Sequence, residues 1–240
     1  MMISDSVIKD LKKLATKKKA KASAWFFKTG KGQYGYGDIF FGVTVPEQRR
    51  VAKKYEDLPL PEIQKLLKSK VHECRLTALL ILVEQYKKTS QDEKNKIVKF
   101  YLKNTKGVNN WDLVDSSSPY ILGDYLLKSY LEARLPSREV LYRLAKSKNL
   151  WERRIAIVST IALIRVGQFE DTLKISEILL SDKHDLIHKA VGWMLREVGK
   201  KSQPTLEKFL KKNIKLLPRT TLRYATERFS EKKRRRYLKK

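Results

Sequence analysis

The chain has 240 residues, enough for one large domain or an extended repeat array with a substantial core. Its 53 Lys and Arg residues exceed its 26 Asp and Glu residues, and the net charge of +27 predicts a polyanionic partner, with nucleic acid favoured over an acidic membrane surface. The single cysteine, Cys74, excludes an intramolecular disulfide and is expected to be a small core residue in a reducing compartment. No apolar run approaches the ~18 residues of a transmembrane helix, and the N-terminus lacks a secretion signal, so a cytoplasmic protein is expected.

Apolar residues at three- and four-residue spacing predict a series of helices with short polar connections and no paired strands. The lysine-rich residues 1–25 are expected to form a basic N-terminal helix, and residues 231–240 a basic C-terminal tail. Ser117 or Ser118 is expected to cap the helix that starts at Pro119. The helices between the two ends are predicted around residues 63–67, 78–86, 97–102, 119–126, 140–144, 155–164, 173–180, 187–198 and 206–210.

Successive helix pairs recur at a spacing of roughly 35 to 45 residues, which is typical of HEAT-like repeats. The predicted fold class is therefore all-α: a HEAT-like α-solenoid of antiparallel helix pairs, forming one domain over residues 1–240 with a basic concave face. An ordinary globular helical bundle is the alternative.

Residues 30–37, the sequence GKGQYGYG, interrupt the helical pattern near the N-terminus. The glycines neither follow a strand nor introduce a clear helix, which argues against a phosphate-binding P-loop. The segment is either a plain connection or a basic loop whose two tyrosines contact DNA.

Three of the four tryptophans stand beside carboxylates and arginines. Trp111 and Asp115 are four residues apart and Trp151 and Arg154 three, so each pair shares one face of a helix. Together with Trp193, such residues suit a flat cationic ligand on a polyanion, as a damaged DNA base would be. Tryptophan faces attract cations by roughly 0.5 to 2 kcal/mol, and a carboxylate stabilises a positively charged sugar transition state.

Structural roles are the alternative for the same residues. Asp115 is equally suited to capping the following helix. Trp151 and Trp193 are equally suited to packing between helices, and Arg153 and Arg196 to pairing with acids or facing solvent.

Other catalytic sets have weaker support. His184 and His188 have the i,i+4 spacing of metal ligands, but no third ligand is evident. No Gly-x-Ser-x-Gly nucleophile motif occurs, and one cysteine cannot hold an iron–sulfur cluster. No metal and no cofactor are expected.

Five segments together match one known family, in the same order along the chain. They are FGVTVPEQR at residues 41–49, NNWDLVD at 109–115, WERR at 151–154, IHKAVGWMLRE at 187–197 and PRTTLRYA at 218–225. In these segments the chain resembles the AlkD family of DNA alkylation-repair glycosylases. The resemblance covers about residues 40–230 and leaves out the lysine-rich first 25 residues.

The resemblance implies a monofunctional DNA glycosylase of base excision repair, which hydrolyses the N-glycosidic bond of N3- and N7-alkylated purines in duplex DNA. It implies Asp115 as the catalytic carboxylate, with Trp111 and Trp193 beside the sugar and Arg154 as the arginine that holds DNA. The other residues expected to bind DNA are Arg49, Arg153, Arg196, Arg219 and Arg223. A monomer is expected. Because some relatives lack activity, a non-catalytic HEAT-like nucleic-acid-binding protein of the same family is the alternative.

Overall fold

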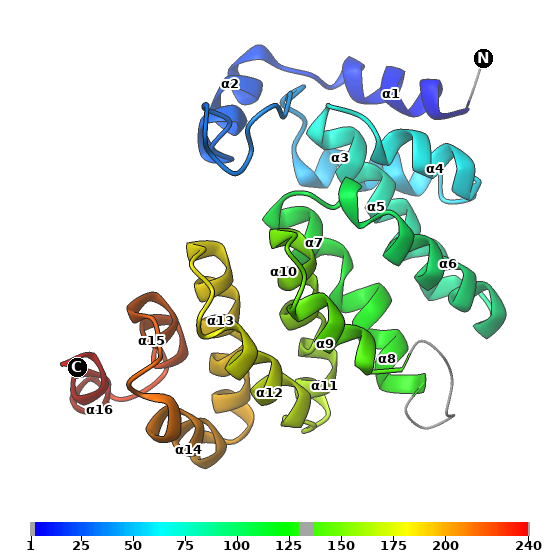
Figure 1. Cartoon of the computed structure of the whole chain (residues 1–240). Coiled ribbons are helices and arrows are strands. Elements are labelled where there is room, and N and C mark those ends of the chain that lie inside the picture. The colour runs from blue at the N-terminus through cyan, green and yellow to red at the C-terminus, as the bar shows by residue number, and fades with distance from the viewer. Residues whose placement is uncertain (1–2, 130–136, 240) are drawn as a thin grey trace. The chain divides into compact units, whose positions relative to one another are not determined.

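The computed structural model describes residues 3–129 and 137–239 of the chain, which divides into two compact units, residues 1–117 and 118–240 (Figure 1). The predicted all-α class is confirmed: the described residues form helices and no β-strand, apart from an isolated bridge between Ile39 and Val71. None of the described helices has the length and apolar character needed to cross a membrane.

The first unit is built from helices joined by short connections, as the apolar periodicity predicts. Its elements are α1 (Ile3–Lys13), α2 (Lys17–Phe26), α3 (Val45–Lys54), α4 (Leu60–Leu67), α5 (His72–Lys88), α6 (Gln91–Lys103), the 3-10 turn η1 (Thr105–Gly107) and α7 (Trp111–Ser117).

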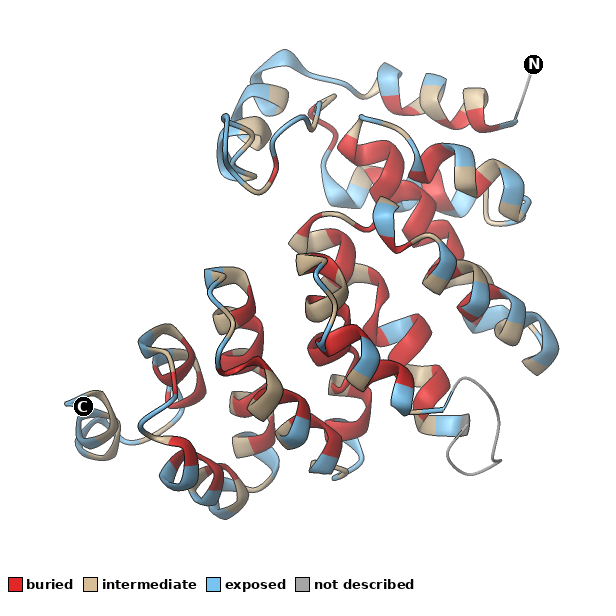
Figure 2. Cartoon of the chain, viewed as in Figure 1, coloured by how far each residue is buried: buried red, intermediate tan, exposed pale blue. Residues whose placement is uncertain are grey.

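Helix α5 forms the core of the first unit. It packs against α1, α3, α4, α6 and α7, and it is buried along most of its length (Figure 2). A helix that is apolar on all sides gains most of its stability from being enclosed in this way. Cys74 lies on α5 with no exposed surface, as predicted, and burial raises the pKa of its thiol to about 11.

The basic N-terminal segment contains two helices, where the sequence pattern suggests one. Helix α1 ends at Lys13, and α2 begins at Lys17. Val7 and Leu11 attach α1 to the core, and both are fully buried. Helix α2, by contrast, buries none of its side chains.

The second unit continues the helical pattern. Its elements are the π-helical turn η2 (Pro119–Gly123), α8 (Asp124–Ser129), α9 (Glu139–Ala145), α10 (Leu150–Ser159), α11 (Ile161–Arg165), α12 (Glu170–Leu179), α13 (Asp185–Lys201), α14 (Gln203–Asn213), α15 (Arg219–Ala225) and α16 (Glu231–Leu238). The last of these forms most of the predicted basic C-terminal tail, and it buries no side chain.

Helix α13 is the central helix of the second unit and packs against α10, α11, α12, α14 and α15. Gly192 lets α15 approach closely, because a Cβ atom at this position would lie 2.5 Å from Cβ of Tyr224 and 2.7 Å from the carbonyl oxygen of Thr221. The glycine beside Trp193 therefore serves helix packing.

The expectation of a serine cap before Pro119 is wrong. Ser118 has helical backbone angles and makes no capping bond, and the Ser117 hydroxyl donates to the Leu113 carbonyl oxygen at 2.6 Å. The Gly123 N–H instead donates to the Ser118 carbonyl oxygen, five residues back, at 2.9 Å. The wider π-helical turn accommodates Pro119, which has no N–H to donate.

Candidate functional site

Helix α7 carries Trp111 and Asp115 four residues apart, so the two side chains leave one face of the helix about one turn apart. Both residues are half-buried. The helix begins at Trp111, whose N–H donates to the side-chain oxygen of Asn110 at 2.8 Å. The i,i+4 relation expected from the sequence therefore holds in the folded chain.

The first turn of α7 is held by the buried ring of His72, the first residue of α5. The Nε2 atom of His72 lies 2.8 Å from Oδ2 of Asp112, and Nδ1 lies 3.2 Å from Oδ2 of Asp38. Arg75 donates to the other oxygen of Asp38 at 2.7 Å, and Asn110 donates to Asp38 at 3.4 Å. These bonds fix the helix next to Trp111.

These contacts set the charge of the imidazole ring. Burial alone would lower the pKa of His72, but the hydrogen bonds with Asp112 and Asp38 outweigh burial and raise the pKa to about 9. Burial alone would raise the pKa of Asp38, yet the hydrogen bond with His72 and the charge of Arg75 lower it. At neutral pH, the ring is therefore a cation between two carboxylates.

Aromatic side chains pack against this cation, and one of them also packs against Trp111. Phe27 stacks on Trp111 with ring centroids 5.4 Å apart, and the edge of Phe26 meets Trp111 at 6.0 Å. Phe27 and Phe40 both lie against the His72 ring, at 4.7 and 4.8 Å. Because aromatic faces attract cations, the cluster stabilises the charged ring as well as fixing the Trp111 indole.

The segment 41–43 depends on a second buried side chain at the start of α5. The carboxylate of Glu73 accepts backbone N–H bonds from Phe41, Gly42 and Val43, at 3.1, 2.7 and 3.2 Å. Gly42 has a φ of +79°, and a Cβ atom there would lie 2.3 Å from the backbone of Thr16 and of Ala20. The glycine of this segment is therefore required by the backbone conformation and by the close approach of residues 16–20.

In the second unit, Trp193 lies half-buried on α13. Arg154 is buried on α10, and its Nη1 donates to the Leu186 carbonyl oxygen at 2.6 Å, which ties α10 to the first turn of α13. Trp151, three residues before Arg154, is also buried, consistent with the expected packing role.

Two of the predicted DNA-binding arginines form ion pairs within the second unit. Arg153 donates to Asp182 at 2.5 Å and to the carbonyl oxygens of Ser147 and Lys148 at 3.0 Å. Arg196 pairs with Glu227 and, at 3.4 Å, with Glu197. Both arginines therefore pair with acidic residues, which was the structural alternative given by the sequence analysis. Their role in DNA binding stays a prediction.

The remaining predicted arginines are exposed. Arg219 and Arg223 lie on α15, and Nη1 of Arg219 donates to the Leu238 carbonyl oxygen at 3.0 Å. Arg49 lies on α3 and lines a hollow of about 390 Å³, whose other charged residues are Lys53, Lys88, Glu56 and Glu84. These three side chains are accessible to a polyanion.

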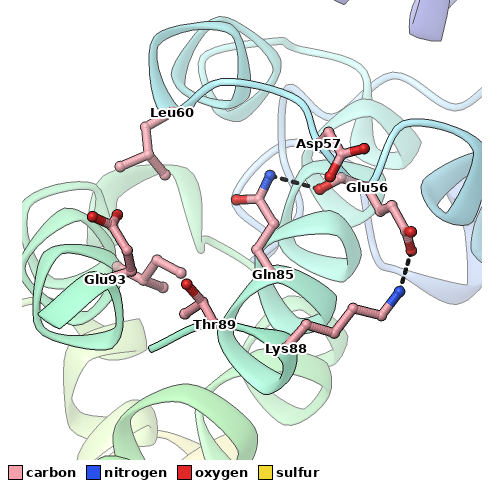
Figure 3. A pocket seen from close by; sticks show the side chains of 8 residues that line it. Glu56, Asp57, Leu60, Gln85, Lys88, Thr89 and Glu93 are labelled. Carbon is pink, nitrogen blue, oxygen red and sulfur yellow. Dashed lines mark hydrogen bonds and ion pairs between the residues drawn. The ribbon is translucent and has the colours of Figure 1, made fainter. Parts of the chain in front are cut away.

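A second hollow of about 370 Å³ in the first unit is acidic (Figure 3). Glu56, Asp57 and Glu93 line it with a single lysine, Lys88, which pairs with Glu56 at 2.5 Å. The Gln85 amide donates to the Glu56 carbonyl oxygen at 2.7 Å. None of the residues predicted to act in the site lines this hollow, and its carboxylates disfavour phosphate.

The two histidines with i,i+4 spacing have structural roles. His184 accepts a bond from the Leu186 N–H at 3.1 Å and so caps α13, and Nε2 of His188 bonds to the Asp182 carbonyl oxygen at 2.5 Å. Within residues 3–129 and 137–239, no three His, Cys, Asp or Glu side chains are grouped to hold a metal ion.

The buried charged residues that hold α7 and the segment 41–43 are not among the site residues predicted from the sequence. His72, Glu73 and Arg75 fall in the first turn of a helix that is otherwise strongly apolar, and that position is the one signal of their burial. Charged residues are almost never fully buried without a partner, and these partners lie 30 or more residues away in the chain.

Comparison with known proteins identifies the family. The sequence model of the DNA alkylation repair enzyme family matches residues 7–229. The chain belongs to this family. Its fold is similar to that of a structure described as a predicted DNA alkylation repair enzyme from Enterococcus faecalis, with a TM-score of 0.71 at 17% identity over 90% of this chain and 97% of that one. This similarity confirms the predicted fold class. No curated protein matches the chain.

Proposed function

We propose that this member of the DNA alkylation repair enzyme family is a monofunctional DNA glycosylase that releases N3- and N7-alkylated purines from duplex DNA. The proposal is supported chiefly by the arrangement of α7. This helix carries Trp111 and Asp115 on one face, and the bond between Asp112 and His72 fixes it in place. Family membership and the net charge of +27 support a DNA substrate.

The chemistry of the lesion fits a site with one carboxylate. Alkylation at N3 or N7 makes the purine cationic, so the base leaves with the electrons of the glycosidic bond and needs no proton. The sugar then carries positive charge at C1′, which Asp115 stabilises; water adds to this carbon and loses a proton to solvent, which leaves the hydroxyl of an abasic site. Trp111, on the same face of α7 as Asp115, is proposed to pack against the sugar, and the role of Trp193 stays a prediction. A preorganised electrostatic group of this kind is typically worth on the order of 10²- to 10³-fold in rate.

The test is release of free base from duplex DNA that carries N7-methylguanine, measured by chromatography. Asp115→Asn should lower release by about 10²-fold or more with little change in DNA affinity. The matched control is Asp92→Asn, an exposed carboxylate at the start of α6, which should leave release unchanged.

The outcomes separate the enzyme from its alternative. Release that is unchanged in Asp115→Asn would contradict the assignment of this carboxylate. If the wild type binds the duplex tightly but releases neither N7-methylguanine nor N3-methyladenine, the protein is a non-catalytic nucleic-acid-binding relative.

A further inference from the structure

Residues 17–37, which comprise α2 and the glycine-rich loop, form a strongly basic surface of the first unit. The segment holds six lysines and no acidic residue. The lysines are Lys17, Lys18, Lys19, Lys21, Lys28 and Lys31, and all of them are exposed. Lys19 lies 3.6 Å from Glu47. The side chains of α2 contribute nothing to the core, so the fold does not account for their composition.

Three large aromatic side chains of the same segment are also exposed. Trp25 is 76% exposed, Phe26 55% and Tyr36 67%, and we call these three residues the aromatic platform. Large apolar side chains scattered singly on a surface need no explanation, but three in one basic segment indicate a binding surface.

The loop folds back against the end of α2. The Gly35 N–H donates to the Lys28 carbonyl oxygen at 3.1 Å, and a Cβ atom on Gly35 would lie 2.3 Å from the carbonyl oxygen of Phe27. This close approach places the backbone of Tyr36 beside the part of α2 that carries Trp25 and Phe26.

The lysines of α2 lie in its first half and the two rings at its end, and lysines and rings share faces of the helix. At 3.6 residues per turn, Lys21 and Trp25 lie one turn apart on the same side, and Lys19 and Phe26 lie two turns apart on another. Trp25 and Phe26 therefore each have a lysine on the same face of the helix, and Nζ of Lys28 lies 5.3 Å from the centroid of the Trp25 ring. Surfaces that bind unpaired nucleic acid combine the same two elements: cations for the phosphates and aromatic rings on which bases stack.

One residue of the platform, Phe26, reaches the candidate site in the first unit. The edge of Phe26 meets the Trp111 ring at 6.0 Å, and Phe27, the next residue, stacks on the same ring at 5.4 Å. A base stacked on the platform would therefore lie near α7.

We propose that the aromatic platform stacks against an unpaired DNA base beside Trp111, so that the protein binds DNA with an unpaired base more tightly than a fully paired duplex. This rests on the proposed function only in taking DNA as the ligand. Stacking tolerates any base, because every base has an aromatic face, so the preference should depend weakly on base identity.

A membrane surface fits the same segment less well. A helix that lies on a membrane needs an apolar face separate from its basic face. In α2 the lysines share the faces of Trp25 and Phe26, and the residues between them are mostly small. The arrangement therefore favours a strand with alternating phosphates and bases over a layered lipid surface.

The test compares a fully paired duplex with the same duplex carrying one unpaired nucleotide, both labelled with fluorescein and titrated by anisotropy. We expect Trp25→Ala to weaken binding to the second DNA about tenfold, with less than a twofold change on the paired duplex. Trp25→Phe should restore most of the loss, because the ring is retained. Leu216→Ala is the matched control, since Leu216 is a large apolar residue of the second unit with 68% exposure.

An equal loss on both DNAs, or no loss, would overturn the proposal. Loss of binding to anionic phospholipid vesicles with DNA binding unchanged would identify a membrane surface instead. Base release by wild type, measured in parallel, tests the proposed function separately. Selective binding without base release would leave the platform standing and reject the glycosylase, and base release without selective binding would do the reverse.

Discussion

Replacing His72 by Gln is expected to remove a contribution to stability that depends on pH. The imidazole ring of His72 is almost fully enclosed, with Asp112 at 2.8 Å and Asp38 at 3.2 Å. Arg75 is the other charged group beside it, and it pairs with Asp38 at 2.7 Å. Glutamine keeps a hydrogen-bonding side chain at this position but carries no charge at any pH.

The expected magnitude follows from the pKa of His72. The ordinary value is 6.5, and the hydrogen bonds with the two carboxylates raise it to about 9 in the folded chain. At 1.36 kcal/mol per pH unit, the protonated ring contributes about 3 kcal/mol to the free energy of unfolding. Because the pKa is higher in the folded state, this contribution is complete below about pH 6.5 and is lost as the pH rises to about 9.

Two measurements test this reasoning. The chain has three histidines, so the ring signal of His72 can be assigned by its loss in His72→Gln, and its NMR titration should have a midpoint near 9. Urea unfolding at pH 6 and pH 9.5 should show that the wild type loses about 3 kcal/mol more than the variant over this interval. A midpoint at or below 6.5, or parallel losses in the two proteins, would refute a charged His72.

Three further predictions concern the packing inside each unit and one expected DNA contact. Glu73→Ala should destabilise the fold by about 3 kcal/mol or more, because three backbone N–H groups lose their acceptor, whereas Glu84→Gln on the same helix should change the urea midpoint little. Gly192→Ala should lower Tm by an amount equivalent to about 1 to 3 kcal/mol, since the new methyl group meets backbone, and Gly199→Ala, which meets the flexible end of a leucine, should cost less. Arg223→Ala should reduce the slope of log K against log salt for DNA binding by about 1, and an unchanged slope would show that this exposed arginine contacts no phosphate.

The helical framework and the relation between Trp111 and Asp115 were predictable from local patterns. Apolar periodicity marks helices whether or not their partners are known, and α5, α6, α12 and α13 fall where it predicts them. The single helix predicted over residues 155–164 is wrong, because α10 ends at Ser159 and α11 begins at Ile161. The i,i+4 pair needs one helical turn and no tertiary contact. Such features depend on neighbours in the chain, which the sequence displays directly.

The anchoring of α7 and of the segment 41–43 was not predictable in the same way. His72 bonds to Asp38 and Asp112, which are 34 and 40 residues distant, and Glu73 bonds to backbone groups 30 to 32 residues away. A pattern of residue types cannot pair such distant groups. The same limit applies to Arg153, whose ion-pair partner Asp182 lies 29 residues further along the chain.

These contacts separate the residues of the segment 109–115 that serve folding from those that can meet a ligand. Asn110 and Asp112 bond to Asp38 and His72, and the side chains of Leu113 and Val114 are fully buried in the core of the first unit. Their identity is therefore explained by folding alone. Trp111 and Asp115 are half-buried on one face of the helix that these bonds fix, so they are the two side chains of the segment best placed to meet a ligand. For this reason the decisive substitution for catalysis is Asp115→Asn, while a change at Asp112 would confound catalysis with the loss of the His72 contact.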